Sequence, residues 1–353
     1  MSAASFRPAS TSIARRTRPR IVVTRRLPEA ALELVRAAGD VWVSPHDRPL
    51  TPDELRAAMA GADAALTLLH DRVDEELLDA AGPRLRCVAN VAAGYDNVDV
   101  AAASRRGVVV TNTPGVLTDA TADLAIALML MVTRRLGEGE RLIRGAVPWS
   151  WDMHFMLGQA LRDKVLGIVG LGEIGRATAR RARAFGMEIL YTGRRRAPEE
   201  IEDELGARMV DRDELFAAAD VVSLHCPLTP ETRRLVDAAH LARMHSGAYL
   251  VNTSRGGLVD EAALVEALRD RAIAGAALDV FEFEPAVHPG LLELDNAVLI
   301  PHLGSATVET RTAMATLAAR NAVAVLRDEA PPTPLNISEL RVAPASGRIA
   351  VAS

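Results

Sequence analysis

The sequence predicts an α/β protein with two doubly wound parallel-sheet domains, the larger being a Rossmann dinucleotide-binding domain inserted into a smaller substrate domain. Three observations support this fold class. Short apolar runs alternate with helical stretches along most of the chain, as in parallel strands joined by right-handed crossovers. The run at residues 165–169 leads into a glycine-rich turn and a helix. The length of 353 residues is sufficient for two domains.

The smaller domain is predicted over residues 21–113 and again over 304–336. Thr51 is a suitable helix cap, and Pro52 suits the first helical turn. We expect helices at residues 28–38, from Thr51 onward and at 74–80, and strands at 21–24, 41–43, 64–68, 85–90 and 108–111.

The larger domain is predicted over residues 114–303. Its first helix, residues 119–136, is apolar on all sides, so we expect it to be buried in the core or in a subunit interface. An arm over residues 141–158 carries Trp149, Trp151 and Phe155, which favour a partner surface or core packing. A final helix at 307–327 returns to the smaller domain. Six strands in two halves are expected at residues 165–169, 188–192, 221–225, 248–253, 275–279 and 298–300.

Composition excludes several classes of function. The net charge of −5 gives no reason to expect nucleic acid as a partner. The two cysteines, Cys87 and Cys226, lack neighbours at metal-ligand spacing and fit a reducing compartment, so we expect no metal site and a cytoplasmic protein. The longest apolar run is too short to cross a membrane. Residues 1–20 are rich in arginine and contain no acid, which suits a disordered extension or, alternatively, a transit peptide. Residues 337–353 are expected to be a disordered tail.

Gly170, Gly172 and Gly175 form a G-x-G-x-x-G pattern between a strand and a helix, the context typical of dinucleotide binding. Gly170 allows the tight turn, Gly172 allows backbone N–H groups to approach a pyrophosphate, and Gly175 allows the helix to pack on the strand. The helix N-terminus offers unpaired N–H groups and a partial positive charge to the phosphates.

The residues at the end of the second strand of this domain discriminate between NAD and NADP. Sites that prefer NAD place an acid there for the ribose 2′-hydroxyl, whereas a 2′-phosphate requires a neutral or cationic group. Here Gly193 stands at that position and Arg194 and Arg195 follow it. Because guanidinium groups bind phosphate well, we expect NADP(H), with NAD as the alternative. A solvated turn would also account for these arginines.

Arg255, Glu284 and His302 each lie at or just after the carboxyl end of a predicted strand, the edge at which open α/β sheets bind ligands. Reduction of a 2-oxo acid needs a cation for the carboxylate, and the planar fork of Arg255 suits this role. It also needs a proton donor, and histidine ordinarily titrates near neutral pH. Glu284 would orient the imidazole and favour its protonated form.

The chain resembles the D-isomer-specific 2-hydroxyacid dehydrogenase family, and most closely its glyoxylate/hydroxypyruvate reductases. The resemblance extends from Ile21 to Asn336. It depends on the glycine turn already described and on segments 225–229, 252–257, 278–285 and 301–305. It implies reduction of a small 2-oxo acid to the D-2-hydroxy acid, with the substrate in a cleft between the domains, and a homodimer.

The resemblance also assigns individual residues. It places the catalytic roles on Arg255, Glu284 and His302, and it places substrate-binding backbone N–H groups at Ala93 and Gly94. Trp151 of the partner subunit is expected to reach the substrate. The cofactor is expected to contact Glu173, Ile174, Cys226, Pro227, Thr253, Asp279 and Gly304.

Two residues depart from the family pattern, and two other functions stay open. Glu173 stands where the family usually has arginine, which removes a phosphate-facing cation, and Gly257 replaces a commonly larger residue. One alternative is an NADH-linked member acting on a larger or phosphorylated 2-oxo acid. The other is a dinucleotide-sensing binding protein similar to the C-terminal-binding corepressors. Turnover assays with both cofactors distinguish these functions.

Overall fold

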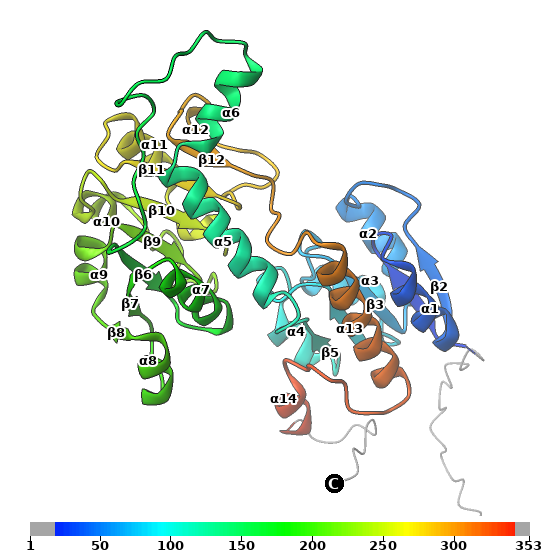
Figure 1. The fold of residues 1–353 in the computed structure, drawn as a ribbon. Coiled ribbons are helices and arrows are strands. Elements are labelled where there is room, and N and C mark those ends of the chain that lie inside the picture. Colours follow the sequence, from blue (N-terminus) through cyan, green and yellow to red (C-terminus); the bar gives the residue numbers. More distant parts are fainter. Residues whose placement is uncertain (1–17, 343–353) are drawn as a thin grey trace, which may run out of the picture. The chain divides into compact units, whose positions relative to one another are not determined.

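The computed structural model describes residues 18–342, which form two compact units. The first unit contains the chain up to Asn112 and from Ala315 onward, and the second contains Thr113–Met314. Each unit is built on one parallel sheet (Figure 1), which confirms the predicted α/β fold class. The chain returns to the first unit within helix α13 (Val308–Leu326) rather than at residue 304, because this helix is continuous across the division.

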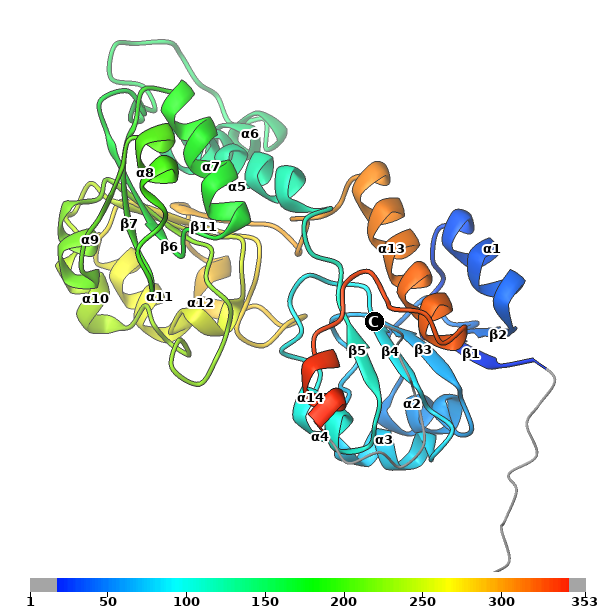
Figure 2. The ribbon, with the colours of Figure 1, turned by 90° about the horizontal axis from the view of Figure 1, so that it is seen from below.

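The first unit contains a five-stranded sheet of order β2-β1-β3-β4-β5. Alternate side chains of the strands lie on opposite faces; Val22, Ala65 and Val88 belong to the core formed with α2, α3 and α4. Figure 2 shows α1 and the later part of α13 on the other face of this sheet. The elements are β1 (Arg20–Val23), α1 (Glu29–Ala38), β2 (Asp40–Val43), α2 (Pro52–Met59), β3 (Ala64–Thr67), α3 (Glu75–Ala81), β4 (Cys87–Asn90), α4 (Val100–Arg105), β5 (Val109–Thr111) and α14 (Ile337–Val342).

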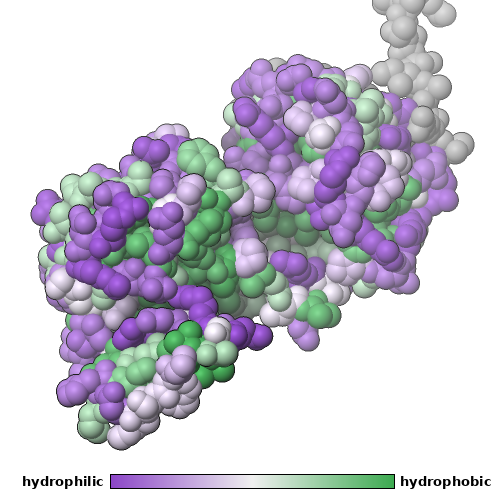
Figure 3. Space-filling model, turned by 90° about the horizontal axis from the view of Figure 1, so that it is seen from above, coloured by the Kyte–Doolittle hydropathy of each residue, from purple (hydrophilic) through white to green (hydrophobic). Residues whose placement is uncertain are grey.

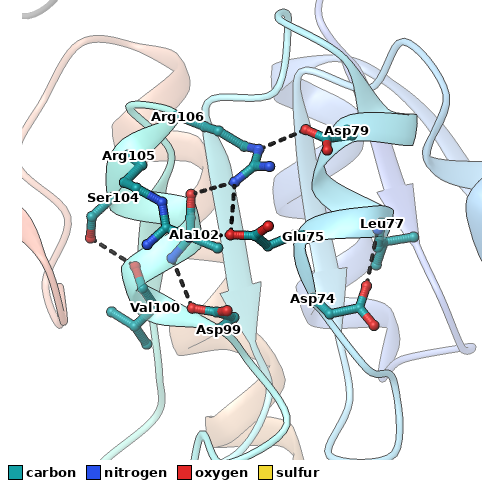
Figure 4. A network of polar contacts seen from close by, with 10 residues as sticks. All are labelled: Asp74, Glu75, Leu77, Asp79, Asp99, Val100, Ala102, Ser104, Arg105 and Arg106. Carbon is teal, nitrogen blue, oxygen red and sulfur yellow. Dashed lines mark hydrogen bonds and ion pairs between the residues drawn. The ribbon is translucent and has the colours of Figure 1, made fainter.

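Polar side chains cap and connect the short helices α3 and α4 of this unit (Figure 4). Asp74 accepts a hydrogen bond from the Leu77 N–H at 3.1 Å, and Asp99 accepts one from Ala102 N–H at 2.8 Å. Arg106 connects the helices through Asp79 at 2.8 Å. Each cap stabilises its helix by about 1 kcal/mol, more than an exposed ion pair of this kind usually contributes.

The second unit contains a seven-stranded sheet of order β12-β11-β10-β9-β6-β7-β8. Helices α5 and α7 pack on one face of this sheet, and α9, α10 and α11 pack on the other. Its elements are α5 (Thr118–Thr133), α6 (Leu136–Arg144), β6 (Val165–Val169), α7 (Glu173–Ala184), β7 (Glu188–Thr192), α8 (Glu199–Leu205), β8 (Ala207–Met209), α9 (Arg212–Ala218), β9 (Val221–Leu224), α10 (Ala238–Arg243), β10 (Tyr249–Asn252), η1 (Gly256–Leu258), α11 (Glu261–Arg269), β11 (Gly275–Leu278), α12 (Pro289–Leu292) and β12 (Ala297–Leu299).

The strand order indicates where along the sheet of this unit a ligand is expected to bind. From the central strand β6 the chain winds outward through β7 and β8, and it then returns to β9 on the other side of β6. The direction of winding therefore reverses between β6 and β9, and a doubly wound sheet binds its ligand at the carboxyl ends of such strands. The glycine turn follows β6 and Cys226 lies just beyond β9, so both lie at this reversal.

The sequence-based prediction is wrong in several details. The sheet of the second unit has seven strands rather than six, because the short edge strand β8 pairs with β7. The single helix expected over residues 119–136 is two helices, since Arg135 adopts a left-handed conformation with φ of 54° between α5 and α6. Four residues of the expected arm, 141–144, also belong to a helix, because α6 continues to Arg144.

Regular secondary structure extends into both of the ends that were expected to be disordered. Strand β1 begins at Arg20, whose backbone N–H donates to Asp63 at 2.8 Å. Helix α14 occupies part of the expected tail because Asn336, which is fully buried, fixes the chain just before it through bonds to Val110 and Val108. Residues 1–17 and 343–353 lie outside the described residues. Within residues 18–342, no helix has the length and apolar character that a membrane span requires.

Candidate active site

The turn after β6 has the steric features that the glycine pattern predicts. Gly170 has φ of 97°, a conformation that favours glycine, and a Cβ atom there would lie 2.8 Å from the backbone nitrogen of Cys226. A Cβ atom on Gly175 would lie 2.4 Å from the carbonyl oxygen of Gly170. By contrast, a Cβ atom on Gly172 would meet nothing within 4 Å. The turn is therefore closed around Gly170 and Gly175 and open at Gly172.

Helix α7 begins directly at this open position. Gly172 is its N-cap residue, and no side chain caps the first turn, so the N–H groups at this end remain available to an anion. Glu173 and Ile174 occupy the first turn. The Glu173 carboxylate is exposed and accepts a weak hydrogen bond from Thr118 at 3.4 Å. This acid opposes the attraction of the helix terminus for phosphate.

The segment after β7 presents Gly193, Arg194 and Arg195, all of them exposed. Gly193 would have room for a Cβ atom, since the only atom within 4 Å is the Arg195 carbonyl oxygen at 3.8 Å. The side chains of Arg194 and Arg195 form no hydrogen bond or ion pair with any residue that the structure describes. Both guanidinium groups are therefore available to a ligand.

A buried acid, Glu202, folds back on this segment and was missed by sequence reasoning. It accepts hydrogen bonds from the Tyr191 hydroxyl at 2.5 Å and from Arg196 at 2.8 Å. These two partners, Arg196 first, lower the pKa of Glu202. Tyr191 also accepts a hydrogen bond from Ala197 N–H at 2.8 Å, which closes the turn. The Glu202 carboxylate is thus paired with an arginine within the protein.

His302 and Glu284, two of the three predicted catalytic residues, are in contact. His302 Nδ1 lies 2.8 Å from Glu284 Oε2, and Glu284 Oε1 accepts a hydrogen bond from Phe281 N–H at 2.9 Å. His302 has φ of 51°, a conformation that is unusual for a residue with a side chain and that clusters at functional sites. Its Nε2 atom is left on the side away from the carboxylate.

The charge of Arg255, the third predicted catalytic residue, acts on the Glu284 carboxylate of this pair. Burial raises the pKa of Glu284, but the hydrogen bond and charge of His302, the Phe281 N–H and the charge of Arg255 together lower it below its ordinary value. Arg255 also donates to the Ser254 carbonyl at 2.9 Å. The three predicted residues therefore interact at one edge of the second unit, and the carboxylate of Glu284 stays ionised at neutral pH.

A close backbone approach connects the Arg255 segment with the Glu284 segment. A Cβ atom on Gly256 would lie 1.8 Å from the carbonyl carbon of Phe281. No side chain fits between these segments, so only glycine allows the turn after Arg255 to pack against the chain before Glu284. Gly257 lacks this restriction, because its nearest contact would be a flexible Leu228 side chain at 3.1 Å.

Asp279 fixes the segment that carries His302. Its carboxylate accepts hydrogen bonds from the N–H groups of Leu303 and of Gly304, the latter at 2.8 Å. Its carbonyl oxygen accepts one from His302 N–H at 2.8 Å. Asp279 is fully buried, and burial raises the pKa of its carboxyl while the two backbone donors oppose the shift. Asp279 is also one of the residues expected to contact the cofactor.

The remaining cofactor residues predicted from the sequence lie near these elements. Ser254 donates to the carbonyl oxygen of Cys226 at 2.6 Å, and Thr232 donates to that of Pro227 at 2.7 Å. Burial raises the pKa of the Cys226 thiol to about 11, so this thiol is protonated. The Thr253 hydroxyl is buried and has no hydrogen-bond partner among the described residues. A buried hydroxyl without a partner is costly, and together with the open cradle at Gly172 it fits a bound dinucleotide.

Three predicted residues are not part of this cluster. Ala93 and Gly94 belong to the first unit, in the loop after β4. Trp151 lies in the arm of the second unit and is 76% exposed. The described residues contain no group of three or more side chains suited to holding a metal ion.

Comparisons with known proteins show what the whole chain is similar to. The sequence model of a family described as D-isomer specific 2-hydroxyacid dehydrogenase, NAD binding domain, matches residues 126–304. A glyoxylate reductase of Thermococcus litoralis is 45% identical over 334 residues, which cover 93% of this chain and 99% of that protein. A protein of Thermus thermophilus with a solved structure is 45% identical, with a TM-score of 0.83 over 90% of this chain and 99% of the other.

A second solved structure contains ligands. It is an NADPH-dependent glyoxylate/hydroxypyruvate reductase from Sinorhizobium meliloti in complex with NADP and malonate. It is 37% identical to this chain, with a TM-score of 0.80 over 92% of this chain and 98% of that protein. The likeness therefore covers both units and not the nucleotide-binding unit alone.

Proposed function

Because the chain belongs to the D-isomer-specific 2-hydroxyacid dehydrogenase family, we propose that it reduces glyoxylate and hydroxypyruvate to the corresponding 2-hydroxy acids. The observation that carries this proposal is the hydrogen bond between His302 Nδ1 and Glu284 Oε2 beside Arg255. A bound reduced nicotinamide dinucleotide supplies the hydride for the carbonyl carbon. The relatives named glyoxylate reductase support the choice of a small substrate.

In this proposal each side chain has one task. Arg255 binds the substrate carboxylate and polarises the carbonyl group, since its planar fork matches a carboxylate. His302 donates the proton on Nε2 to the carbonyl oxygen, which becomes the hydroxyl of the product. Glu284 orients the ring and stabilises its positive charge until the proton leaves. The backbone N–H groups of the Ala93-Gly94 loop contribute to binding the carboxylate.

Replacement of His302 tests the proton donor. In His302→Gln, kcat for glyoxylate should fall by at least about 100-fold, because general acid catalysis commonly contributes that much. The Kd of NADPH, measured by fluorescence, should change little, since His302 is not one of the residues expected to hold the dinucleotide. Turnover close to that of the wild type would contradict the assignment, and a wild-type protein that binds NADPH without turnover would favour the sensor alternative.

We further propose that the cofactor is NADP(H). The side chains of Arg194 and Arg195 form no hydrogen bond or ion pair with a described residue, although the charge of Arg194 acts on the exposed Glu231 carboxylate. Glu202 is paired with Arg196 and with the Tyr191 hydroxyl. A 2′-phosphate would therefore meet two guanidinium groups at the end of β7. The NADP bound by the Sinorhizobium meliloti reductase supports the same choice.

A double substitution, Arg194→Ala with Arg195→Ala, tests this preference. KM for NADPH should rise at least about tenfold, because two charge-assisted hydrogen bonds to the phosphate are lost. KM for NADH, which lacks that phosphate, should change by less than about twofold. Arg208→Ala serves as the control, because Arg208 is also exposed in this unit but pairs with Glu214. Equal effects on both cofactors would reject the phosphate site.

We also propose a cytoplasmic homodimer in which the surface around α6 is the interface. Helix α6 has no buried residue, and the surface of this unit carries exposed apolar side chains (Figure 3). Surfaces of this kind mark protein contacts, and in a dimer they would place Trp151 of one subunit at the substrate of the other. The exposed side chains are Leu136, Ile143, Val147, Trp149, Trp151, Met153 and Leu157.

Sedimentation and one variant test the dimer. The wild type should sediment as a dimer at micromolar concentration, and Trp151→Ala should raise KM for hydroxypyruvate several-fold while the protein remains dimeric. Trp151 is chosen because it is the most exposed aromatic residue of the arm. A monomeric wild type with full activity would refute the proposal.

A further inference from the structure

Buried asparagine side chains hold the loop after β4 in the first unit. Asn112 Nδ2 donates to the carbonyl oxygen of Ala93 at 2.7 Å, and Asn90 Nδ2 donates to that of Gly94 at 3.2 Å. Asn90 is fully buried and Asn112 is 7% exposed. Two consecutive carbonyl groups of the loop are therefore bound from the interior of the unit.

These two bonds determine the direction of the next two N–H groups. In a trans peptide the C=O and the following N–H point in opposite directions, and the only cis peptide bond in residues 18–342 is Glu284–Pro285. The Gly94 N–H therefore points away from Asn112, and the Tyr95 N–H points away from Asn90. Neither N–H forms a hydrogen bond with a described residue, and Tyr95 is 45% exposed.

Both asparagines are themselves fixed by hydrogen bonds. Asn90 Oδ1 accepts from the Thr67 hydroxyl at 3.1 Å, and Asn90 Nδ2 also donates to Asn97 Oδ1 at 3.1 Å. Asn97 Nδ2 in turn donates to the carbonyl oxygen of Asp71 at 2.9 Å. The amide of Asn90 is thereby held by β3 and by the end of the loop.

The returning carboxyl-terminal segment fixes Asn112. The Thr333 hydroxyl donates to the Asn112 carbonyl oxygen at 2.7 Å, and Asn321 of α13 both donates to Thr333 Oγ1 at 2.8 Å and accepts from its N–H at 3.0 Å. The loop is thus positioned by segments far from it in sequence.

We propose that Asn90 and Asn112 are positioning residues for the substrate carboxylate. By holding two carbonyl groups inward, they direct the adjacent N–H groups of Gly94 and Tyr95 outward as a pair of donors, rather than the N–H groups of Ala93 and Gly94 expected from the sequence. Successive N–H groups of this kind bind anions. Two donors one residue apart match the two oxygens of one carboxylate, so the pair suits a 2-oxo monocarboxylate. This inference depends on the proposed function and assigns residues that the catalytic set does not contain.

The test replaces each amide with alanine, because an acid at either position would itself repel the substrate. In Asn90→Ala and Asn112→Ala, KM for glyoxylate and the inhibition constant of oxamate should both rise about tenfold, since loss of orientation weakens hydrogen bonds to a charged group. kcat should stay within about twofold, because the weakened hydrogen bonds bind the substrate and the transition state equally. The Kd of NADPH should not change. Asn112→Ser is the second variant if the alanine form does not fold.

Asn336→Ala is the matched control. Asn336 is an equally buried amide of the same unit, but its partners are Val110, Val108 and Ser104 rather than the loop. Its substitution should lower the melting temperature and leave KM unchanged. Unchanged KM in both test variants, or an equal rise of KM in the control, would overturn this inference. The proposed function would still hold in that case, provided that the wild type turns over glyoxylate or hydroxypyruvate. A wild type that turns over neither glyoxylate nor hydroxypyruvate would overturn both.

Discussion

The proposed site depends most on the hydrogen bond between His302 and Glu284, because it decides which ring nitrogen would face a substrate. Nδ1 is occupied by the carboxylate at 2.8 Å, so Nε2 is the atom available for proton transfer. The carboxylate is held in turn by Phe281 N–H, and the segment of His302 is held by Asp279. The geometry of this pair is thus imposed by backbone contacts of the second unit.

In each unit, buried polar side chains fix a loop by hydrogen bonds to two successive backbone groups. In the second unit the Asp279 carboxylate accepts from two successive N–H groups, which fixes a loop that carries a side chain. In the first unit Asn90 and Asn112 donate to two successive carbonyl groups, which fixes a loop that offers N–H groups. Both loops follow the carboxyl ends of parallel strands, where such sheets bind ligands.

The features that could be predicted from the sequence are those that depend on local sterics or on residues at the ends of strands. The fold class and the family are confirmed, and the glycine turn has the predicted geometry because Gly170 and Gly175 have no room for a side chain. The return of Glu202 to Tyr191 and the bonds from Asn112 to Ala93 were not predicted, since they join residues that only the tertiary fold brings together. The edge strand β8 was missed for the same reason, whereas the break at Arg135 depends on a left-handed backbone conformation that this residue type does not predict. The roles of Arg255, Glu284 and His302 stay predictions.

The most direct measurement is kcat for glyoxylate reduction in the wild type and in Glu284→Gln, together with the Kd of NADPH in both proteins. In the proposed mechanism His302 donates a proton, and Glu284 orients its ring and stabilises its positive charge. Loss of the carboxylate should therefore lower kcat at least about tenfold, while the Kd of NADPH stays unchanged. A kcat close to that of the wild type, or a loss of turnover that comes with an equal loss of NADPH binding, would contradict this role of Glu284.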